Sequence, residues 1–190
     1  MKSLAVVSAL ALFGADARMS FGDCPKPNLQ SNFDVNAYDG KWYEIKRDSV
    51  FMFEMGQECV TEHFQPDGNG DHTLYFRGWF WQMFFQYMGV EGKMYCNTGS
   101  DSTCEVTMAE SEKRVPFNIL RTDYNNWAVN YFCTPMMGGT MKMEWLNILS
   151  RDTTLSSSLL ADAEAVIKAE LPDFDISDWT MRKTQQGGTC

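Results

Sequence analysis

The sequence predicts an all-β fold: an eight-stranded antiparallel up-and-down β-barrel with one C-terminal α-helix packed outside it. Residues 40–150 are short runs of β-favouring side chains, separated by turn signals at 66–71, 97–102, 122–126 and 135–139. Between 154 and 171, apolar residues recur at helical spacing, and Pro172 follows. A meander of about eight strands has two unpaired edges, and closing it into a barrel removes them.

The first 17 residues have the pattern of a secretory signal peptide. Lys2 precedes an apolar stretch from 4 to 14, and small residues stand at Ala15 and Ala17, after which we expect cleavage. The stretch is too short to span a bilayer, and no later run of about 20 apolar residues follows. We therefore expect residues 18–190 to form a single soluble domain that is secreted.

The flanks of the predicted barrel are less regular. Residues 24–34 contain prolines and asparagines, which indicates irregular backbone, and the polar tail 173–190 ends in a cysteine that can tether it. The 190-residue chain has 16 Lys and Arg against 25 Asp and Glu, a net charge of −9, and losing residues 1–17 removes one charge of each sign. An acidic surface argues against nucleic acid and against anionic membranes as partners.

The cysteines and histidines indicate disulfides and not a metal site. The chain has six cysteines and no C-x-x-C, and an even count in a secreted chain predicts three disulfides. Its two histidines, His63 and His72, lie on either side of a predicted turn, where they do not assemble a His/Cys cluster. Ser-His-Asp, HExxH and phosphate-loop patterns and N-glycosylation sequons are also missing. We expect no metal, no cofactor and no catalytic residues.

Three separated motifs resemble those of the lipocalin family, in its apolipoprotein D-like branch. They are DGKWYEI at 39–45, LRTDYNNWAVNYFC at 120–133 and ILSR at 148–151. The resemblance implies that Trp42, two residues after Gly40, plugs the closed end of a lipocalin barrel, with Arg151 over its indole in a cation–π contact. It also implies that Thr122, Asp123 and Tyr124 form a structural turn at that end.

The resemblance extends to the cysteines. It implies that Cys24 pairs with Cys133 and that Cys59 pairs with Cys190, so that both terminal segments are attached to the barrel wall. Cys96 and Cys104 depart from the family pattern, and we expect them to form a local clamp across a hairpin.

Strand alternation then sorts side chains between the lumen and the outside. We take Cys59, Cys133 and Trp127 to face outward, and we count the last strand back from Arg151 in the register of the family. This register points Lys142 and Glu144 into solvent. The predicted ligand-binding residues on the inner face are Phe64, Leu74, Phe76, Phe117, Ile119, Asn130, Phe132, Met143, Trp145 and Asn147. This wall favours a small hydrophobic ligand such as a retinoid, a carotenoid or other pigment, a fatty acid or a sterol. The two asparagines can orient its hydroxyl or carboxyl group.

Two segments allow alternative interpretations. Residues 49–56 lie where lipocalins have a loop over the barrel mouth, so Phe51–Phe53 form either a lid, which we favour, or a transient contact with a membrane or receptor. The aromatic stretch 79–88 either lines the pocket or forms a dimer face. The oligomeric state stays open.

The function that we expect is reversible carriage of the ligand, without chemistry. An alternative is an enzyme on the same fold, of the isomerase or de-epoxidase type. It would need a reactive thiol or an acidic group in the cavity, and Glu44 and Glu62 are the carboxylates that can point inward. A second alternative is a protein-interaction module that uses the Phe and Met side chains of residues 49–56.

Overall fold

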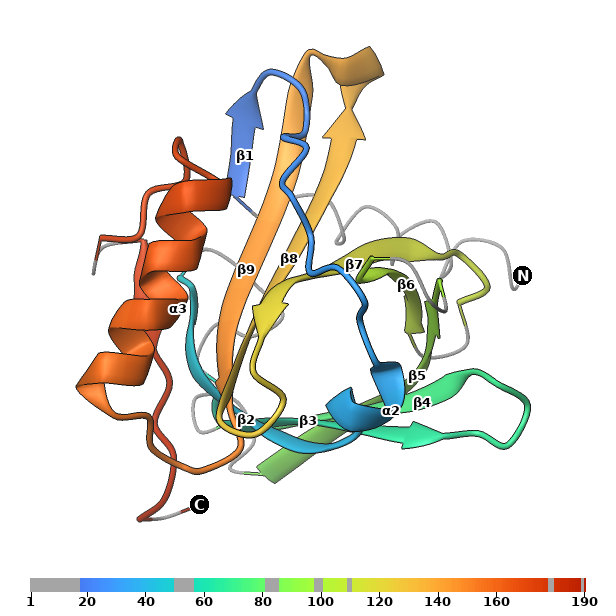
Figure 1. Ribbon diagram of the computed structural model, residues 1–190, viewed down its shortest axis with the longest axis vertical. Coiled ribbons are helices and arrows are strands. Elements are labelled where there is room, and N and C mark those ends of the chain that lie inside the picture. The colour runs from blue at the N-terminus through green and yellow to red at the C-terminus, as the bar shows by residue number, and fades with distance from the viewer. Residues whose placement is uncertain are drawn as a thin grey trace, which may run out of the picture.

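The computed structural model describes residues 18–49, 57–80, 86–97, 101–108, 111–177, 180–188 and 190. Within them, eight antiparallel strands form a closed barrel in which each strand pairs with the next and the last pairs with the first (Figure 1). The strands are β2 (Gly40–Asp48), β3 (Gln57–Pro66), β4 (His72–Phe80), β5 (Gln86–Cys96), β6 (Thr103–Met108), β7 (Val115–Thr122), β8 (Trp127–Met136) and β9 (Met141–Ser150). The predicted barrel is confirmed.

The predicted helix is also confirmed, as α3 (Ser157–Glu170) on the outside of the barrel (Figure 1). Ser156 begins it by accepting a hydrogen bond from the Leu159 N–H group at 3.3 Å, which satisfies one free donor of the first turn. Ala163 and Ile167 are buried on its inner face. They pack in one cluster with outward side chains of the strands, among them Leu120, Val129, Leu146 and Ile148. No helix in the described ranges is long and apolar enough to cross a membrane.

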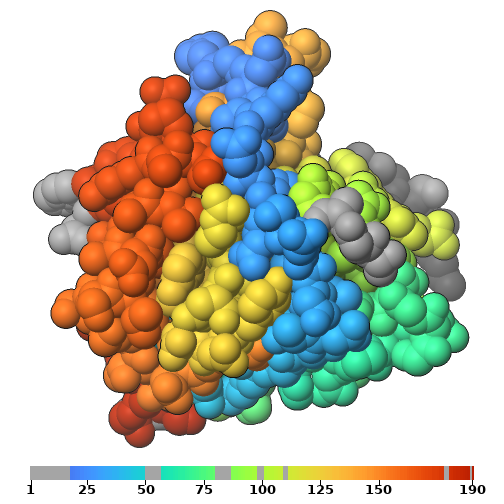
Figure 2. Space-filling model, viewed as in Figure 1, coloured from blue at the N-terminus to red at the C-terminus, as the bar shows by residue number. Residues whose placement is uncertain are grey.

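The structure adds short elements that the sequence did not predict. These are β1 (Arg18–Phe21), α2 (Val35–Tyr38), the 3-10 turn η2 (Met137–Gly139) and β10 (Met181–Lys183). The one-turn helix α2 begins at Asp34, whose side chain accepts hydrogen bonds from the N–H groups of Asn36 and Ala37. With the preceding segment and the turn between β7 and β8, α2 covers one end of the barrel (Figure 2).

Strand β1 corrects the expectation that Glu144 lies in solvent. Glu144 is on the outer face of β9, but it is only 4% exposed. The reason is that β1 pairs alongside, with Arg18 opposite Glu144. The carboxylate accepts a hydrogen bond from the Tyr131 hydroxyl at 2.7 Å and pairs with Lys142 at 3.0 Å. Lys142 is likewise mostly covered, with 15% of its side chain exposed.

The C-terminal tail forms part of the barrel wall. Strands β2 and β3 pair only over residues 40–43 and 61–64, and beyond that point β10 pairs with residues 46–48 of β2. The Gln186 side chain then donates to the carbonyls of Glu44, at 2.9 Å, and Val60, at 2.7 Å, and so bridges the two separated strands. The tail that the sequence indicated as tethered therefore fills a gap between β2 and β3.

All six cysteines lie in the described ranges and are paired. The disulfides are Cys24–Cys133, Cys59–Cys190 and Cys96–Cys104. These are the pairs that the resemblance and the local spacing implied. The Cys59–Cys190 bridge fixes the tail in the wall.

Peptide mapping of the native protein under non-reducing conditions is therefore expected to recover three crosslinked peptides, one for each of these pairs, and no alkylated thiol. The same digest after reduction is the control. A different pairing would mean that the tail does not lie between β2 and β3.

Candidate functional site

The closed end of the barrel is built around Trp42. Its indole is fully buried and donates to the Tyr38 carbonyl at 2.9 Å. The Arg151 guanidinium lies over the ring at 3.6 Å from its centroid and donates to the carbonyls of Lys41, Tyr38 and Tyr124. Gly40 has a φ of +99°, and a Cβ there would lie 3.1 Å from Arg151 Nη1, so this position requires glycine. Trp42 and Arg151 thus close the barrel.

The turn at 122–126 lies at the same end. The Asp123 carboxylate accepts hydrogen bonds from the N–H groups of Asn126 and Trp127, at 2.7 and 3.0 Å. Burial alone would raise the pKa of Asp123, but these hydrogen bonds outweigh it and lower that pKa. Thr122 Oγ1 donates to the Trp127 carbonyl, and the Tyr124 hydroxyl accepts from the Asp34 N–H group. All of these bonds hold backbone in place.

Above the closed end, β8 and β9 present successive pairs of inward side chains. From the closed end upward, the paired residues are Ala128 and Leu149, Asn130 and Asn147, Phe132 and Trp145, and Thr134 and Met143. The first two pairs are fully buried, Trp145 is 8% exposed, and Phe132, Thr134 and Met143 are half-buried. Exposure therefore rises away from Trp42.

The second pair belongs to a hydrogen-bonded set that we call the polar layer: Tyr38, Glu62, Asn130 and Asn147. The Glu62 carboxyl accepts from Asn147 Nδ2 at 2.6 Å and from Asn130 Nδ2 at 3.5 Å, and the Tyr38 hydroxyl donates to Asn130 Oδ1 at 2.9 Å. All four residues are at most 1% exposed. Burial, followed by the nearby charge of Glu44, raises the pKa of Glu62 to about 8, against the hydrogen bond from Asn147.

Glu44 lies beside the polar layer and is bound to a cation. Its Oε1 pairs with Arg47 Nη1 at 2.5 Å and accepts from the Thr184 hydroxyl at 2.5 Å. Arg47 also donates to the Gln57 carbonyl at 2.7 Å. Glu44 and Arg47 are each at most 1% exposed, so the ion pair is shielded from water.

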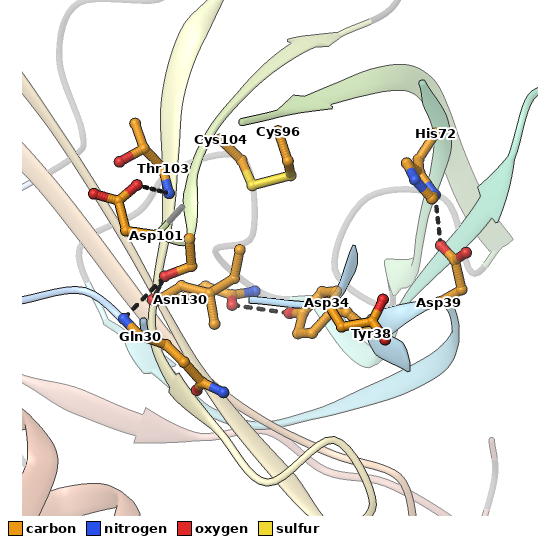
Figure 3. Close-up of a disulfide and its surroundings, with 12 residues drawn as sticks. Gln30, Asp34, Tyr38, Asp39, His72, Cys96, Asp101, Thr103, Cys104 and Asn130 are labelled. Carbon is orange, nitrogen blue, oxygen red and sulfur yellow. Dashed lines mark hydrogen bonds and ion pairs between the residues drawn. A yellow bond between two sulfur atoms is a disulfide. The ribbon is translucent and has the colours of Figure 1, made fainter. Parts of the chain in front are cut away.

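The other predicted ligand-binding residues surround the same interior. Phe64, Leu74, Phe117 and Ile119 are buried in one cluster with Trp42 and Trp145. Phe76 is half-buried and pairs with Glu62 across β3 and β4. The Cys96–Cys104 disulfide packs against this cluster and lies inside the ring of strands, together with the Tyr38–Asn130 hydrogen bond (Figure 3). The clamp therefore contributes to the inner wall.

Strand β5 also becomes more exposed away from the closed end. Alternation places Met88, Val90 and Met94 on one face, and their exposed fractions are 45%, 36% and 0%. β5 extends beyond the end of β6, and a hollow of about 500 Å³ lies there, lined by Gly89, Val90, Glu91, Gly92, Lys93, Thr107 and Ser111. None of the lining residues belongs to the polar layer.

The described part of the aromatic stretch 79–88 includes an outer-face cluster. Trp79 and Tyr87 meet edge to face at 5.0 Å, and the Arg77 guanidinium lies over the Tyr87 ring. The Tyr87 hydroxyl donates to the Cys190 carbonyl at 2.9 Å, which connects this cluster to the tail. Residues 81–85 of the stretch, and the predicted lid Phe51–Phe53, lie outside the described residues.

Strand alternation, counted in the register that the family resemblance implies, identified part of the polar layer. Asn130 and Asn147 were predicted to face the lumen, and Glu62 was named as a carboxylate that can point inward. Tyr38 was missed because it belongs to α2, where no pattern predicted a helix. Arg47 and Thr184 were missed because a register shift between Glu44 and Lys46 breaks the alternation of β2, and because the tail enters the wall.

Comparisons with known proteins agree with this architecture. The model of the family described as "Lipocalin / cytosolic fatty-acid binding protein family" matches residues 39–187. Apolipoprotein D of Cavia porcellus is 33% identical over 187 residues, covering 94% of this chain and 93% of that protein. Bilin-binding protein of Pieris brassicae is 24% identical over 163 residues, covering 82% and 81%. The structure of apocrustacyanin C1 superposes with a TM-score of 0.75 at 24% identity, covering 90% and 93%.

Proposed function

Because this chain belongs to the lipocalin family, we propose that it is a secreted carrier that binds a small hydrophobic molecule reversibly in the lumen of its barrel. One observation carries the proposal: on β8 and β9 the fully buried inward pairs of the closed end give way to an apolar zone, in which Trp145 is 8% exposed and Phe132 and Met143 are half-buried. A wall that is closed and polar below, and apolar and accessible above, suits a ligand that enters by one end.

The apolar zone suggests which ligands to test. Aromatic and Met side chains supply affinity through buried apolar area, at roughly 25 cal/mol per Å². One relative is named for binding bilin, which is a pigment. Retinoids, carotenoids and other pigments, sterols and fatty acids are the classes that we propose.

Two further observations support carriage outside the cell. Three disulfides are expected in an oxidising compartment, and the sequence pattern of residues 1–17 agrees with export. Because all six cysteines are paired, a thiol-dependent enzyme on this fold has no thiol to use.

Replacing Trp145 with alanine is expected to weaken ligand binding by about 1–3 kcal/mol, because an apolar contact in the lumen is lost. The measurement is a titration of retinol, a sterol and a fatty acid, followed by tryptophan emission and by calorimetry.

Trp127→Ala is the matched control, since Trp127 is also 8% exposed but packs on the outer face with α3. The two variants should lose similar stability, and only Trp145→Ala should lose affinity per folded molecule. If either alanine variant fails to fold, the phenylalanine variants Trp145→Phe and Trp127→Phe, which retain an aromatic ring, are compared in the same way. Equal affinities in the two variants would place the ligand elsewhere.

A further inference from the structure

The inner wall contains hydrogen-bond acceptors that are buried and have no partner. Asn147 Oδ1 is one of them. The residue is 0% exposed, and in its side chain only the Nδ2 atom makes a hydrogen bond, which it donates to Glu62. Glu44 Oε2 is a second, because Arg47 and Thr184 both bond to Oε1. An unsatisfied buried polar atom costs about 1–3 kcal/mol in a folded protein, so these atoms indicate a missing donor.

The charges around the polar layer also discriminate between ligands. Two carboxyl groups, Glu44 and Glu62, are buried there. Arg47 is the one Lys or Arg side chain that is buried in the described ranges, and it is bound to Glu44. The raised pKa of Glu62 is consistent with a carboxyl group that lacks its own cation. A ligand carboxylate would find no buried cation there that is not already bound to Glu44, and it has no hydrogen to donate to Asn147 Oδ1, which is costly in a low dielectric.

The position of Asn147 places its free acceptor within reach of a ligand. Asn147 lies one inward step below Trp145 on β9, and Phe132 lies opposite Trp145 on β8. A ligand whose apolar body contacts Trp145 and Phe132 would end at Asn147. Its end group would therefore meet the polar layer.

We propose that the ligand of this lipocalin carries a hydrogen-bond donor, a hydroxyl or an amine, at its buried end, that this group donates to Asn147 Oδ1, and that ligands ending in a carboxylate are excluded. The inference rests on the proposed carrier function and narrows its ligand class. It removes fatty acids from the candidates and replaces the expectation that the asparagines accept either a hydroxyl or a carboxyl group.

The test uses ligands that share one hydrocarbon chain and differ only at the end group: hexadecanol, hexadecylamine, hexadecanoic acid and hexadecyl methyl ether. Each displaces an apolar fluorescent probe from the wild-type protein at neutral pH, below the concentration at which the ligands aggregate. Retinol and retinoic acid repeat the comparison on a second skeleton. We expect the alcohol or the amine to bind at least tenfold more tightly than the acid, and several-fold more tightly than the ether, which cannot donate. Comparing the alcohol with the amine identifies which donor the site prefers.

Two variants assign the preference to the polar layer. Asn147→Leu is expected to reduce the ratio of alcohol affinity to ether affinity to about one, whereas Asn118→Leu, the same change on β7 outside the polar layer, should retain the ratio.

The wild-type series alone can overturn the inference. If the acid or the ether binds as tightly as both the alcohol and the amine, the proposed end-group preference is wrong, although the carrier function stands. If the folded protein binds neither series, the carrier function itself is contradicted, and the inference with it.

Discussion

Replacing Trp42 with alanine is expected to lower the free energy of unfolding by about 3–5 kcal/mol, the range for truncating a large aromatic residue in a core. The side chain is fully buried, and its removal leaves a cavity at the closed end of the barrel. It also takes away the hydrogen bond to the Tyr38 carbonyl and the ring under Arg151. The loss should appear in urea unfolding and in the melting temperature.

The control for this variant is Trp42→Phe, which retains an aromatic ring and should lose clearly less stability. Ligand affinity per folded molecule should remain near that of the wild type in both variants, because Trp42 packs under Arg151 at the closed end and is not part of the apolar zone at Phe132, Trp145 and Met143. A Trp42→Ala protein that melts like the wild type but no longer binds ligand would show that Trp42 belongs to the binding site.

Replacing Glu62 with glutamine is expected to remove a pH dependence of stability of about 5 kcal/mol. The pKa of Glu62 is raised to about 8 in the folded protein, from 4.5, by its burial and by Glu44. Between these two values the folded state holds a proton that the unfolded state has released, so wild-type stability falls as pH rises through this range. Each pKa unit contributes about 1.4 kcal/mol. As pH rises through the same range, the free energy of unfolding of the glutamine variant should fall much less than that of the wild type.

Urea unfolding of both proteins across this pH range is the measurement. Glu91→Gln, the same substitution at an exposed position of β5, should follow the wild-type curve. Parallel curves for wild type and Glu62→Gln would mean that Glu62 titrates near its ordinary pKa, and that water reaches the polar layer.

Several features of the molecule could be predicted from the sequence because they depend on local patterns. Alternation within each strand, turn residues between strands and apolar spacing in 154–171 are properties of neighbouring residues, and they suffice for the barrel and for α3. The family motifs located Trp42 and Arg151 and implied the disulfide pairs that attach the terminal segments. In the register that the family resemblance implies, alternation also sorted Phe64, Phe117 and Trp145 from Trp127 and Cys133, since successive side chains of a strand point to opposite faces.

Contacts between distant segments could not be read in this way. Glu144 lies on the outer face as predicted, yet it is buried because β1, more than 120 residues earlier, pairs beside it. The tail enters the wall because β2 and β3 separate beyond residues 43 and 61, which leaves their backbone groups to bond with β10 and Gln186. A polar tail with a terminal cysteine indicates a tether, but it does not indicate which strands lack a partner.

The sequence by itself thus determined the eight strands of the barrel, the helix α3 and the cysteine positions and, in the register that the family resemblance implies, the face on which most side chains lie. Only the tertiary structure decided the chemistry of the interior. Glu62 bonds to amides 68 and 85 residues away, Tyr38 bonds to Asn130 across 92 residues, and Glu44 bonds to Thr184 across 140. The pKa of Glu62 and the free acceptor on Asn147 depend on how these buried groups enclose one another. Such an environment is a property of the closed barrel and not of any single strand.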